Sequence, residues 1–350
     1  MVDIKALVRP HIQDLKPYSS ARDEYSGSEG VFLDANENAL GSITEKPWNR
    51  YPDPYQRALK EKIATIKGID PKHLFLGNGS DEPIDLLFRA FCEPKTDHVI
   101  INPPTYGMYQ VSADIHQVAA KAVSLTSDFD LDVDGITACW NEKTKMIFIC
   151  SPNNPTGNEM SLGKIEYLLH AFHGLVVIDE AYIDFSARAS FIHRLEEFPN
   201  LVVLQTFSKA WGLAGLRLGM AYASTEILSF LNKIKAPYNL SGLVQETVID
   251  ALEHVEKKNE MVKEILQNKA ELKEALKTLP FVNEVYPSDA NFLLVKMNGA
   301  REIFKQLIAQ KIIVRDRSGV VLCEDGLRIT VGTSKENHTL VEALKALSNH

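Results

Sequence analysis

Short apolar runs alternate with helix-like stretches through the middle of the chain, and this alternation restricts the possible folds more than any other sequence feature. Helix-like stretches start at Thr105 and cover residues 161–172. The apolar runs have the length and β-branched character of buried strands, and they lie at Val99–Asn102, Lys121–Ser124, Met146–Cys150, Leu175–Ile178 and Leu201–Leu204. Strands that alternate with helices favour a largely parallel sheet covered on both faces. The sequence therefore predicts the α/β fold class.

Polar residues follow three of these strands, at the sheet edge where α/β proteins bind ligands. Tyr106 follows the run at 99–102, Asn154 lies in the S-P-N-N-P-T-G segment at 151–157, and Asp179 ends the run at 175–178. A carboxylate after four apolar residues is costly to bury unless it meets a cation, such as a protonated pyridine nitrogen. A metal-binding or Walker-B-like acid is the alternative. The sequence contains no G-x-x-x-x-G-K-[ST] loop, which disfavours that alternative.

Lys209 lies just beyond the strand predicted at 201–204, where the edge of an apolar sheet removes solvent from its amine. Desolvation favours the neutral amine, which is a nucleophile toward aldehydes. Thr206, Ser208 and Arg217 lie close by in the sequence and provide two hydroxyls and a planar cation, a combination that binds phosphate. For the tripeptide Ser208-Lys209-Ala210 taken alone, a solvated loop lysine is the simpler interpretation, because most lysines are exposed.

A glycine-containing loop precedes a helix-like stretch at residues 74–91. Ser80 can cap this helix, Asp81 and Glu82 suit its first turn, and its free backbone amides can bind a phosphate. A plain helix cap explains the loop equally well. The carboxylates of Asp81 and Glu82 disfavour a phosphate at the start of the helix unless their side chains point away from it. A nucleotide-binding module built on the same loop is a further alternative. Such a protein would bind ATP and would not absorb visible light.

The C-terminal residues alternate strand-like and helix-like stretches again and predict a small α+β domain. Arg315 and Arg328 interrupt apolar strands there, and a guanidinium suits a planar anion; edge-strand charges are the simpler alternative. The expected division of the chain is an N-terminal arm with part of the small domain, a large domain, connecting helices and a small domain, at residues 1–40, 41–240, 241–278 and 279–350.

Composition disfavours several classes of function. The net charge of -8 gives no reason to expect nucleic acid or an anionic membrane as a partner, and no apolar run approaches the length of a membrane span. The first residues contain no apolar signal core. The four cysteines are widely scattered, which fits neither a metal site nor a disulfide framework. Reduced thiols in a cytoplasmic protein without a metal are the simpler interpretation.

Five segments together resemble one family. The lysine segment, T-F-S-K at 206–209 with G-L-A-G-L-R-L-G at 212–219, resembles that of the fold-type I pyridoxal-phosphate aminotransferases. The segments at 17–22, 33–38, 151–157 and 327–332 occur in the order found in histidinol-phosphate aminotransferases, so the resemblance runs from Tyr18 to Arg328. Ala39 replaces a proline of the family's L-x-x-N-E-N-P motif, which weakens the match of that loop.

The resemblance implies roles for the residues around a pyridoxal 5'-phosphate cofactor. Lys209 is expected to bind the cofactor covalently and to act as general acid and base, and Asp179 is expected to keep the pyridine nitrogen protonated. Tyr106 is expected to stack on the ring, while Tyr182 and Asn154 are expected to contact its phenolic oxygen. The remaining cofactor-binding residues implied are Ser80, Asp81, Thr206, Ser208, Arg217 and, from the neighbouring subunit of a homodimer, Tyr51.

The resemblance also implies a reaction, in which L-histidinol phosphate and 2-oxoglutarate exchange an amino group to give imidazole-acetol phosphate and L-glutamate. Arg328 is expected to bind the α-carboxylate, and Arg315 and Tyr18 the substrate's phosphate or second carboxylate; Asn154 is expected to contact the substrate as well. An aromatic aminotransferase and a phosphothreonine decarboxylase of the same fold are alternatives. A non-catalytic cofactor-binding domain, as in some transcriptional regulators, is a third, but residues 1–40 show no helix-turn-helix pattern or basic patch.

Overall fold

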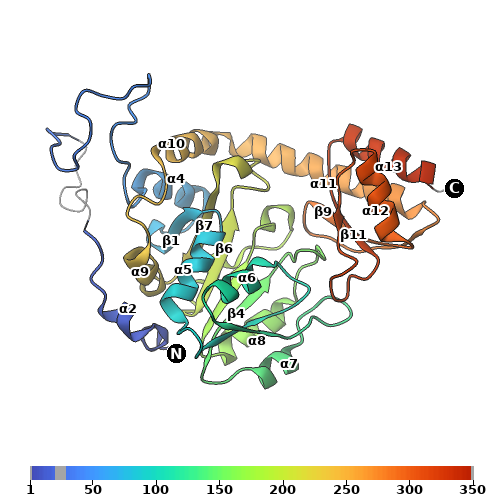
Figure 1. The fold of residues 1–350 in the computed structure, drawn as a ribbon, viewed down its shortest axis with the longest axis horizontal. Helices are drawn as coiled ribbons and strands as arrows, with labels where there is room; N and C mark the ends of the chain where they lie inside the picture. Colours follow the sequence, from blue (N-terminus) through green and yellow to red (C-terminus); the bar gives the residue numbers. More distant parts are fainter. Residues whose placement is uncertain (1, 20–28, 348–350) are drawn as a thin grey trace.

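The larger part of the molecule is built on a seven-stranded sheet (Figure 1). The computed structural model describes residues 2–19 and 29–347. The strand order is β1-β7-β6-β5-β4-β2-β3. The strands are β1 (Leu74–Asn78), β2 (His98–Ile101), β3 (Ala119–Ala122), β4 (Thr144–Cys150), β5 (Leu175–Asp179), β6 (Leu201–Thr206) and β7 (Leu218–Ala223). The pairs among β2 to β6 are parallel, and β7 runs antiparallel to β1 and β6. The predicted largely parallel sheet is confirmed.

Helices cover both faces of this sheet, because successive residues of its central strands point to opposite sides. In β5, Val176 and Ile178 join one buried apolar cluster, whereas Leu175 and Val177 join another. The first cluster also contains side chains of α4 (Arg57–Lys67), α7 (Val133–Cys139), α8 (Leu162–Ala171) and α10 (Gly242–Ala251). The second contains side chains of α5 (Asp81–Phe91), α6 (Met108–Ile115) and α9 (Thr225–Ile234).

The N-terminal residues differ from the expected arm. Residues 4–14 form two short helices, α1 (Ile4–Leu7) and α2 (Pro10–Asp14), and Ile4, Val8 and Ile12 are buried in the cluster that contains α5 and α9. They therefore pack on the large sheet, and the assignment of residues 1–40 to an arm with part of the small domain stays a prediction. Helices this short span too few positions to show a periodic pattern. Residues 29–50 extend from the body, as Figure 1 shows at its upper left.

A long helix connects the large sheet with the smaller C-terminal part (Figure 1). α11 (Val255–Lys277) leads to a four-stranded antiparallel sheet of order β10-β11-β9-β8. Its strands are β8 (Val282–Val285), β9 (Phe292–Met297), β10 (Arg315–Asp316) and β11 (Gly326–Thr330), and α12 (Ala300–Ala309) and α13 (Ser334–Leu347) pack on it with α11. The strand expected around Arg315 is only two residues long. The limits of the large and small domains stay a prediction.

Short 3₁₀ helices complete the fold, at Pro71–His73, Ile183–Phe185, Phe191–Arg194, Ala214–Leu216 and Leu252–His254. None of the helices in residues 2–19 and 29–347 combines the length and apolar character that crossing a bilayer requires. The parallel strands β4, β5 and β6 end at the same edge of the sheet, so the residues that follow these strands lie close together.

Candidate active site

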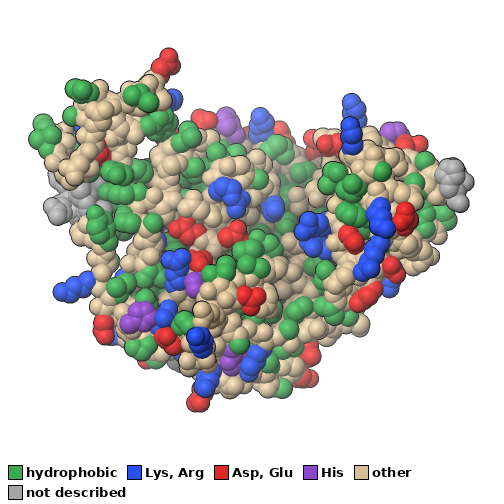
Figure 2. All heavy atoms as spheres, in the orientation of Figure 1, with side chains coloured by type: hydrophobic (Ala, Val, Ile, Leu, Met, Phe, Trp, Pro, Cys, Tyr) green, Lys and Arg blue, Asp and Glu red, His purple; other side chains and the backbone are tan. Residues whose placement is uncertain are grey.

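A cavity of about 740 Å³ lies at the carboxyl ends of β4, β5 and β6 and reaches the C-terminal sheet. Figure 2 shows a hollow between the larger and smaller parts of the molecule, with Lys and Arg side chains at its edges. The predicted site residues that line the cavity are Ser80, Asp81, Tyr106, Asn154, Asp179, Tyr182, Thr206, Ser208, Lys209, Arg217, Arg315 and Arg328. Residues more than two hundred positions apart in the sequence therefore meet in one site.

Asp179 is a buried carboxylate at the end of β5. The Tyr109 hydroxyl donates to Asp179 Oδ2 at 2.7 Å, and the Ala181 amide donates to Oδ1 at 3.1 Å. Burial raises the pKa of Asp179 to about 6 despite these two hydrogen bonds, which lower it. The carboxylate is thus fixed in position but short of positive charge. A cation in this part of the cavity would stabilise its ionised form.

Lys209 lies three residues beyond β6, with its amine 5.6 Å from the centre of the Tyr182 ring. Its side chain is open to the cavity, yet the walls that surround the amine remove much of its solvent. This burial lowers the pKa of Lys209, and the charge of Arg328 lowers it further, while Asp179 raises it. The amine is therefore easier to deprotonate than that of an ordinary lysine, as the strand-end position predicted.

One end of the cavity is formed by Gly79 and Ser80, the start of α5 and Arg217. The Gly79 amide donates to the carbonyl of Arg217 at 2.7 Å, which joins the two segments. Ser80 precedes α5 without a side-chain capping bond. The two acids of the first helical turn are both engaged: Asp81 lies 3.5 Å from Arg217 Nη2, and Glu82 accepts from the Asn78 amide at 2.5 Å.

The hydroxyl groups near Lys209 also face this end of the cavity. Thr206 Oγ1 donates to Ser208 Oγ at 3.0 Å and accepts from the Ser208 amide at 3.1 Å. The Tyr106 hydroxyl donates to Asp81 Oδ1 at 3.1 Å. Burial and the Asp81 charge both raise the pKa of Tyr106, so its hydroxyl stays protonated. These contacts hold a set of neutral donors beside Arg217.

The opposite wall comes from the C-terminal sheet and the loop after β4. Arg328 Nη1 donates to Asn154 Oδ1 at 2.5 Å, which links β11 with that loop. The Arg328 guanidinium lies over the Phe292 ring, 5.3 Å from its centre. Burial lowers the pKa of Arg328. A guanidinium held in this way presents its remaining N–H groups to a planar anion.

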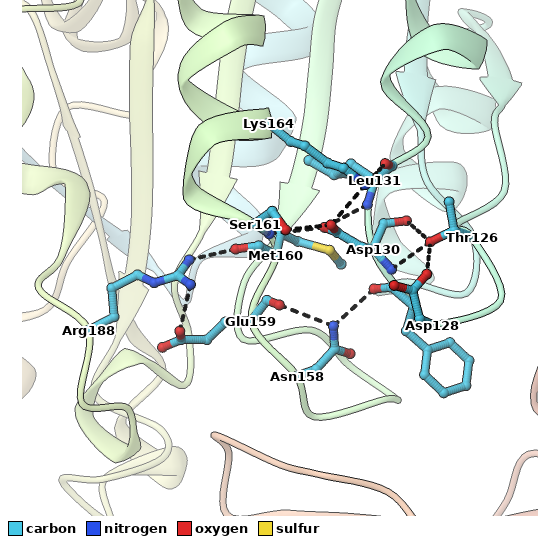
Figure 3. Close-up of polar contacts among 11 residues, drawn as sticks. Thr126, Asp128, Asp130, Leu131, Asn158, Glu159, Met160, Ser161, Lys164 and Arg188 are labelled. Carbon is cyan, nitrogen blue, oxygen red and sulfur yellow. Dashed lines mark hydrogen bonds and ion pairs between the residues drawn. The ribbon is translucent and has the colours of Figure 1, made fainter.

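Polar contacts fix the loop that carries Asn154, and Figure 3 shows those that follow it at Asn158, Glu159 and Arg188. The buried Asn153 amide donates to the Pro104 carbonyl at 2.8 Å and to Thr156 Oγ1 at 2.7 Å. Farther along, Asn158 Nδ2 donates to the Phe129 carbonyl at 2.9 Å, and Arg188 pairs with Glu159 at 2.8 Å. These bonds attach both ends of the loop to the body, so Asn154 is positioned by rigid surroundings.

Asp130 anchors the helix that follows this loop. It accepts from the Ser161 amide at 2.9 Å and from the Ser161 hydroxyl at 2.5 Å, and Lys164 Nζ lies 2.9 Å from the same carboxylate (Figure 3). Burial alone would raise the pKa of Asp130, but the hydrogen bonds from Ser161 and Lys164 outweigh it and lower the pKa. The start of α8 is thereby tied to the segment before α7.

Two functional candidates were missed in the sequence. Tyr109 holds Asp179, and its only signal was its position three residues after Tyr106, with which it forms an edge-to-face ring pair at 5.6 Å. Arg317 lines the cavity, and its signal was the two-residue spacing from Arg315, which places both side chains on one face of an extended segment.

Two predicted residues lie elsewhere in this chain. Tyr51 stacks on Tyr238 with ring centres 4.5 Å apart and is 51% exposed. Tyr18 is 75% exposed. Their expected roles in a neighbouring subunit stay a prediction. Among the described side chains, no group of three or more His, Cys, Asp or Glu residues is placed to hold a metal ion.

Known proteins with the same arrangement define its class. The family described as aminotransferase class I and II matches residues 24–344, so the chain is a class I and II aminotransferase by family and fold. A histidinol-phosphate aminotransferase from Cytophaga hutchinsonii is 55% identical over 342 residues, which cover 98% of each chain. The chain belongs to the histidinol-phosphate aminotransferase family.

Solved structures share the fold. The crystal structure of the histidinol-phosphate aminotransferase from Clostridium acetobutylicum has a TM-score of 0.80 at 23% identity, covering 86% of this chain and 91% of the other. The enzyme from Sinorhizobium meliloti, solved in complex with pyridoxal-5'-phosphate, has a TM-score of 0.79 at 22% identity and covers 97% of both chains. At these identities the likeness establishes the fold alone.

Proposed function

We propose that the protein exchanges an amino group between L-histidinol phosphate and 2-oxoglutarate, with pyridoxal 5'-phosphate as cofactor, and serves histidine biosynthesis. The observation that carries the proposal is the position of Lys209, Asp179 and Arg328 on the walls of one cavity. They provide a nucleophilic amine, a buried carboxylate and an anion-binding guanidinium. Membership of the histidinol-phosphate aminotransferase family supports the choice of substrates.

The end of the cavity near Gly79 fits the cofactor's phosphate. A methyl group on Gly219 would lie 2.2 Å from the Gly79 carbonyl carbon and 2.3 Å from the Ser80 amide, so the strand and the loop touch through their backbones. This contact holds the start of α5 at the cavity wall, where free amides and the helix dipole favour an anion. Ser80 and Arg217 add a hydroxyl and a guanidinium.

The wall at Asp179 fits a protonated pyridine ring. The carboxylate is buried and short of positive charge, and a pyridinium N–H would supply both a charge and a donor. Tyr106 lines the same cavity and offers a flat aromatic face for stacking. The Tyr182 hydroxyl stays protonated because burial raises its pKa, so it can donate to an oxygen of the ring. We assign these roles as the resemblance implied them.

The chain's own groups carry out the proton transfers. Pyridoxal phosphate, when bound, supplies an aldehyde that combines with amines and a ring that withdraws electrons from the adjoining carbon. Lys209 Nζ, with its lowered pKa, would take the proton from the substrate Cα as general base, once an incoming amine has freed it, and would give the proton back as general acid. Tyr109 and the Ala181 amide keep the Asp179 carboxylate from rotating while its charge is needed.

Both amino donors carry an anion that the C-terminal sheet can bind. Arg328 presents its guanidinium beside Asn154, and Arg315 lies opposite it in the register of β10 and β11. Glutamate offers carboxylates and histidinol phosphate offers a phosphate, and a guanidinium binds either one. The same wall can therefore serve both halves of the reaction.

We extend the proposal to a homodimer in which Tyr18 and Tyr51 reach the partner's site. The segment 29–50 exposes apolar side chains to solvent, with Val31 87%, Leu33 83%, Leu40 99% and Ile43 104% exposed. Several exposed apolar side chains within one segment are typical of protein interfaces. Sedimentation as a species of twice the chain mass would support the dimer, and sedimentation as a monomer at micromolar concentration would contradict it.

We also propose that the protein works in the cytoplasm. Its four cysteines, Cys92, Cys139, Cys150 and Cys323, all occur as free thiols. Reduced cysteines are typical of proteins in reducing compartments.

Steady-state assays with four amines test the proposed reaction. The purified protein loaded with pyridoxal phosphate is expected to give a kcat/KM for L-histidinol phosphate at least roughly tenfold above that for L-phenylalanine, because a bound phosphate adds charge-assisted hydrogen bonds. L-Glutamate should react as the second donor. Carbon dioxide release from phosphothreonine would indicate the decarboxylase instead. Equal kcat/KM values for phenylalanine and histidinol phosphate would indicate an aromatic aminotransferase. If no amine were turned over, the protein would be a non-catalytic cofactor-binding module.

Gly219→Ala is expected to weaken cofactor binding by roughly tenfold or more and to lower the free energy of unfolding by about 1–3 kcal/mol. The added methyl group collides with the Gly79–Ser80 backbone, which must move away from the phosphate position. Equilibrium titration with pyridoxal phosphate and urea unfolding measure the two effects. The matched control is Gly215→Ala in the same segment, where a methyl group meets nothing within 4 Å. Equal behaviour of the two variants would contradict the proposed phosphate position.

A further inference from the structure

The short pairing of β10 with β11 gathers three arginines on one wall of the cavity. Arg315 lies directly opposite Arg328 in the antiparallel register. The Arg317 amide donates to the Gly326 carbonyl at 2.9 Å, which continues the pairing beyond β10. Since side chains two residues apart in an extended segment share a face, Arg317 lies on the face of Arg315. All three side chains line the cavity.

This cluster of like charges is unfavourable without an anion. Cations directly opposite each other in a sheet destabilise it. Burial lowers the pKa of Arg317, and the charges of Arg328 and Arg315 lower it further. The neighbouring carboxylate, Asp316, accepts from the Ser318 amide at 2.8 Å. An arrangement that costs stability in the free protein is expected where a bound anion offsets the cost.

Unused hydrogen-bond donors point to the same conclusion. Arg317 Nε and Arg328 Nε are buried, and neither has a partner in the part of the chain that the structure describes. Arg328 already donates through Nη1 to Asn154. Buried donors are normally satisfied, so a pair of unsatisfied donors on the wall of a cavity indicates a ligand with several acceptor atoms.

We propose that Arg317 is a third anion-binding residue, and that it makes the site favour a phosphate-bearing substrate over one that carries only carboxylates. This inference rests on the proposed function and deepens it. A phosphate monoester presents three terminal oxygens and close to two negative charges, whereas a carboxylate presents two oxygens and one charge. The two carboxylates of glutamate can pair with Arg328 and Arg315, which leaves Arg317 without an anion of its own. The three guanidinium groups match the charge and acceptor number of the phosphate.

Arg317→Gln tests the inference by comparing two donors. The variant is expected to lower kcat/KM for L-histidinol phosphate by roughly 10- to 100-fold, mainly through KM, because a charge-assisted hydrogen bond to a dianion is lost. The same quantity for L-glutamate is expected to fall by roughly threefold or less. Arg317→Lys keeps the positive charge but lacks the planar guanidinium group. Its kcat/KM for L-histidinol phosphate should lie between those of the wild type and Arg317→Gln.

Arg301→Gln is the matched control, because Arg301 is exposed on α12 near Gly319 and lies outside the cavity. It removes the same charge, and it is expected to change kcat/KM by no more than roughly twofold for either amino donor. Thermal unfolding of each variant shows whether the fold is kept. Arg317 would lose its assigned role if both donors were affected equally in the two folded Arg317 variants, or if histidinol phosphate were unaffected.

Competition by inorganic phosphate separates this inference from the proposed reaction. Phosphate is expected to inhibit the glutamate half-reaction competitively, and Arg317→Gln is expected to raise its inhibition constant by roughly tenfold. This readout needs no histidinol phosphate. A wild type that uses glutamate but not histidinol phosphate would overturn the proposed reaction, while a tenfold change in phosphate inhibition would still support Arg317. An inhibition constant equal in the wild type and the variant would overturn Arg317 alone.

Discussion

Lys209→Ala is expected to lower kcat for L-histidinol phosphate by roughly 10⁴-fold, because it removes both the amine that binds the cofactor and the base that moves the Cα proton. The amine is suited to this task, since burial in the cavity lowers its pKa and Asp179 lies close enough to oppose that shift. Single-turnover measurements of the glutamate half-reaction show the loss directly. Added methylamine should restore part of the rate to Lys209→Ala, because a free amine can act as the missing base.

Two further variants separate proton transfer from charge. Lys209→Arg keeps the positive charge but cannot be deprotonated at working pH, so it should be as inactive as Lys209→Ala. Lys258→Ala is the matched control: Lys258 is a half-buried lysine that pairs with Asp184 at 3.3 Å and lies outside the cavity. It should keep nearly all activity. A Lys209→Ala enzyme with more than about a tenth of the wild-type kcat would contradict the assignment.

Asp179→Asn is expected to lower kcat by roughly 10²- to 10⁴-fold, because the neutral amide cannot stabilise a protonated pyridine nitrogen. The two oxygens of this carboxylate are held by Tyr109 and the Ala181 amide, so the substituted amide keeps the same position. The cofactor should still bind through Lys209 and the phosphate end. Titration with pyridoxal phosphate and steady-state kinetics measure the two effects separately.

The same substitution is expected to stabilise the protein in the absence of cofactor. The folded pKa of Asp179 is raised to about 6, above its value in the unfolded chain, so the unfolded state releases its proton first. Stability contributed by this group is therefore lost as pH rises from about 4 to about 6, by up to about 3 kcal/mol. Asparagine does not titrate. Without cofactor, Asp179→Asn should gain stability over the wild type between these pH values and keep the gain at pH 8.

Glu180→Gln is the control that separates the loss of kcat from the change in stability. Glu180 is also a buried carboxylate with a raised pKa, but it accepts from the Phe191 amide at 2.8 Å and from Gln205 at 2.9 Å, and it lies outside the cavity. Its replacement should alter stability without a large change in kcat. If Asp179→Asn kept wild-type kcat, or if its stability relative to the wild type without cofactor did not change with pH, the role given to Asp179 would be wrong.

Much of the site could be predicted from the sequence because each residue follows an element with a strong local pattern. Asp179 and Lys209 follow apolar runs that become β5 and β6, and parallel strands finish at the same sheet edge. The contact between Tyr109 and Asp179 could not be predicted, since it joins residues 70 positions apart across the helix–sheet packing. Arg317 was missed because its significance depends on the pairing of β10 with β11, which no local pattern specifies.

The fold was predicted least well where elements are very short. Helices of four or five residues, such as α1 and α2, gain their stability from tertiary packing of Ile4, Val8 and Ile12 rather than from helix propensity. The antiparallel placement of β7 between β1 and β6 was not anticipated either. That placement brings Gly219 against Gly79, and it depends on contacts between strands that are far apart in the sequence.

The hydrogen bond from Arg328 to Asn154 has a consequence for turnover. Before any substrate arrives, one edge of the guanidinium already has an acceptor, supplied by the chain itself. An incoming carboxylate or phosphate that takes this edge replaces one partner with another, so the net gain is much smaller than a newly formed bond would give. Once such an anion leaves, Asn154 Oδ1 is available to accept from this edge again. An acceptor supplied by the chain itself therefore favours rapid release of the product over tight binding.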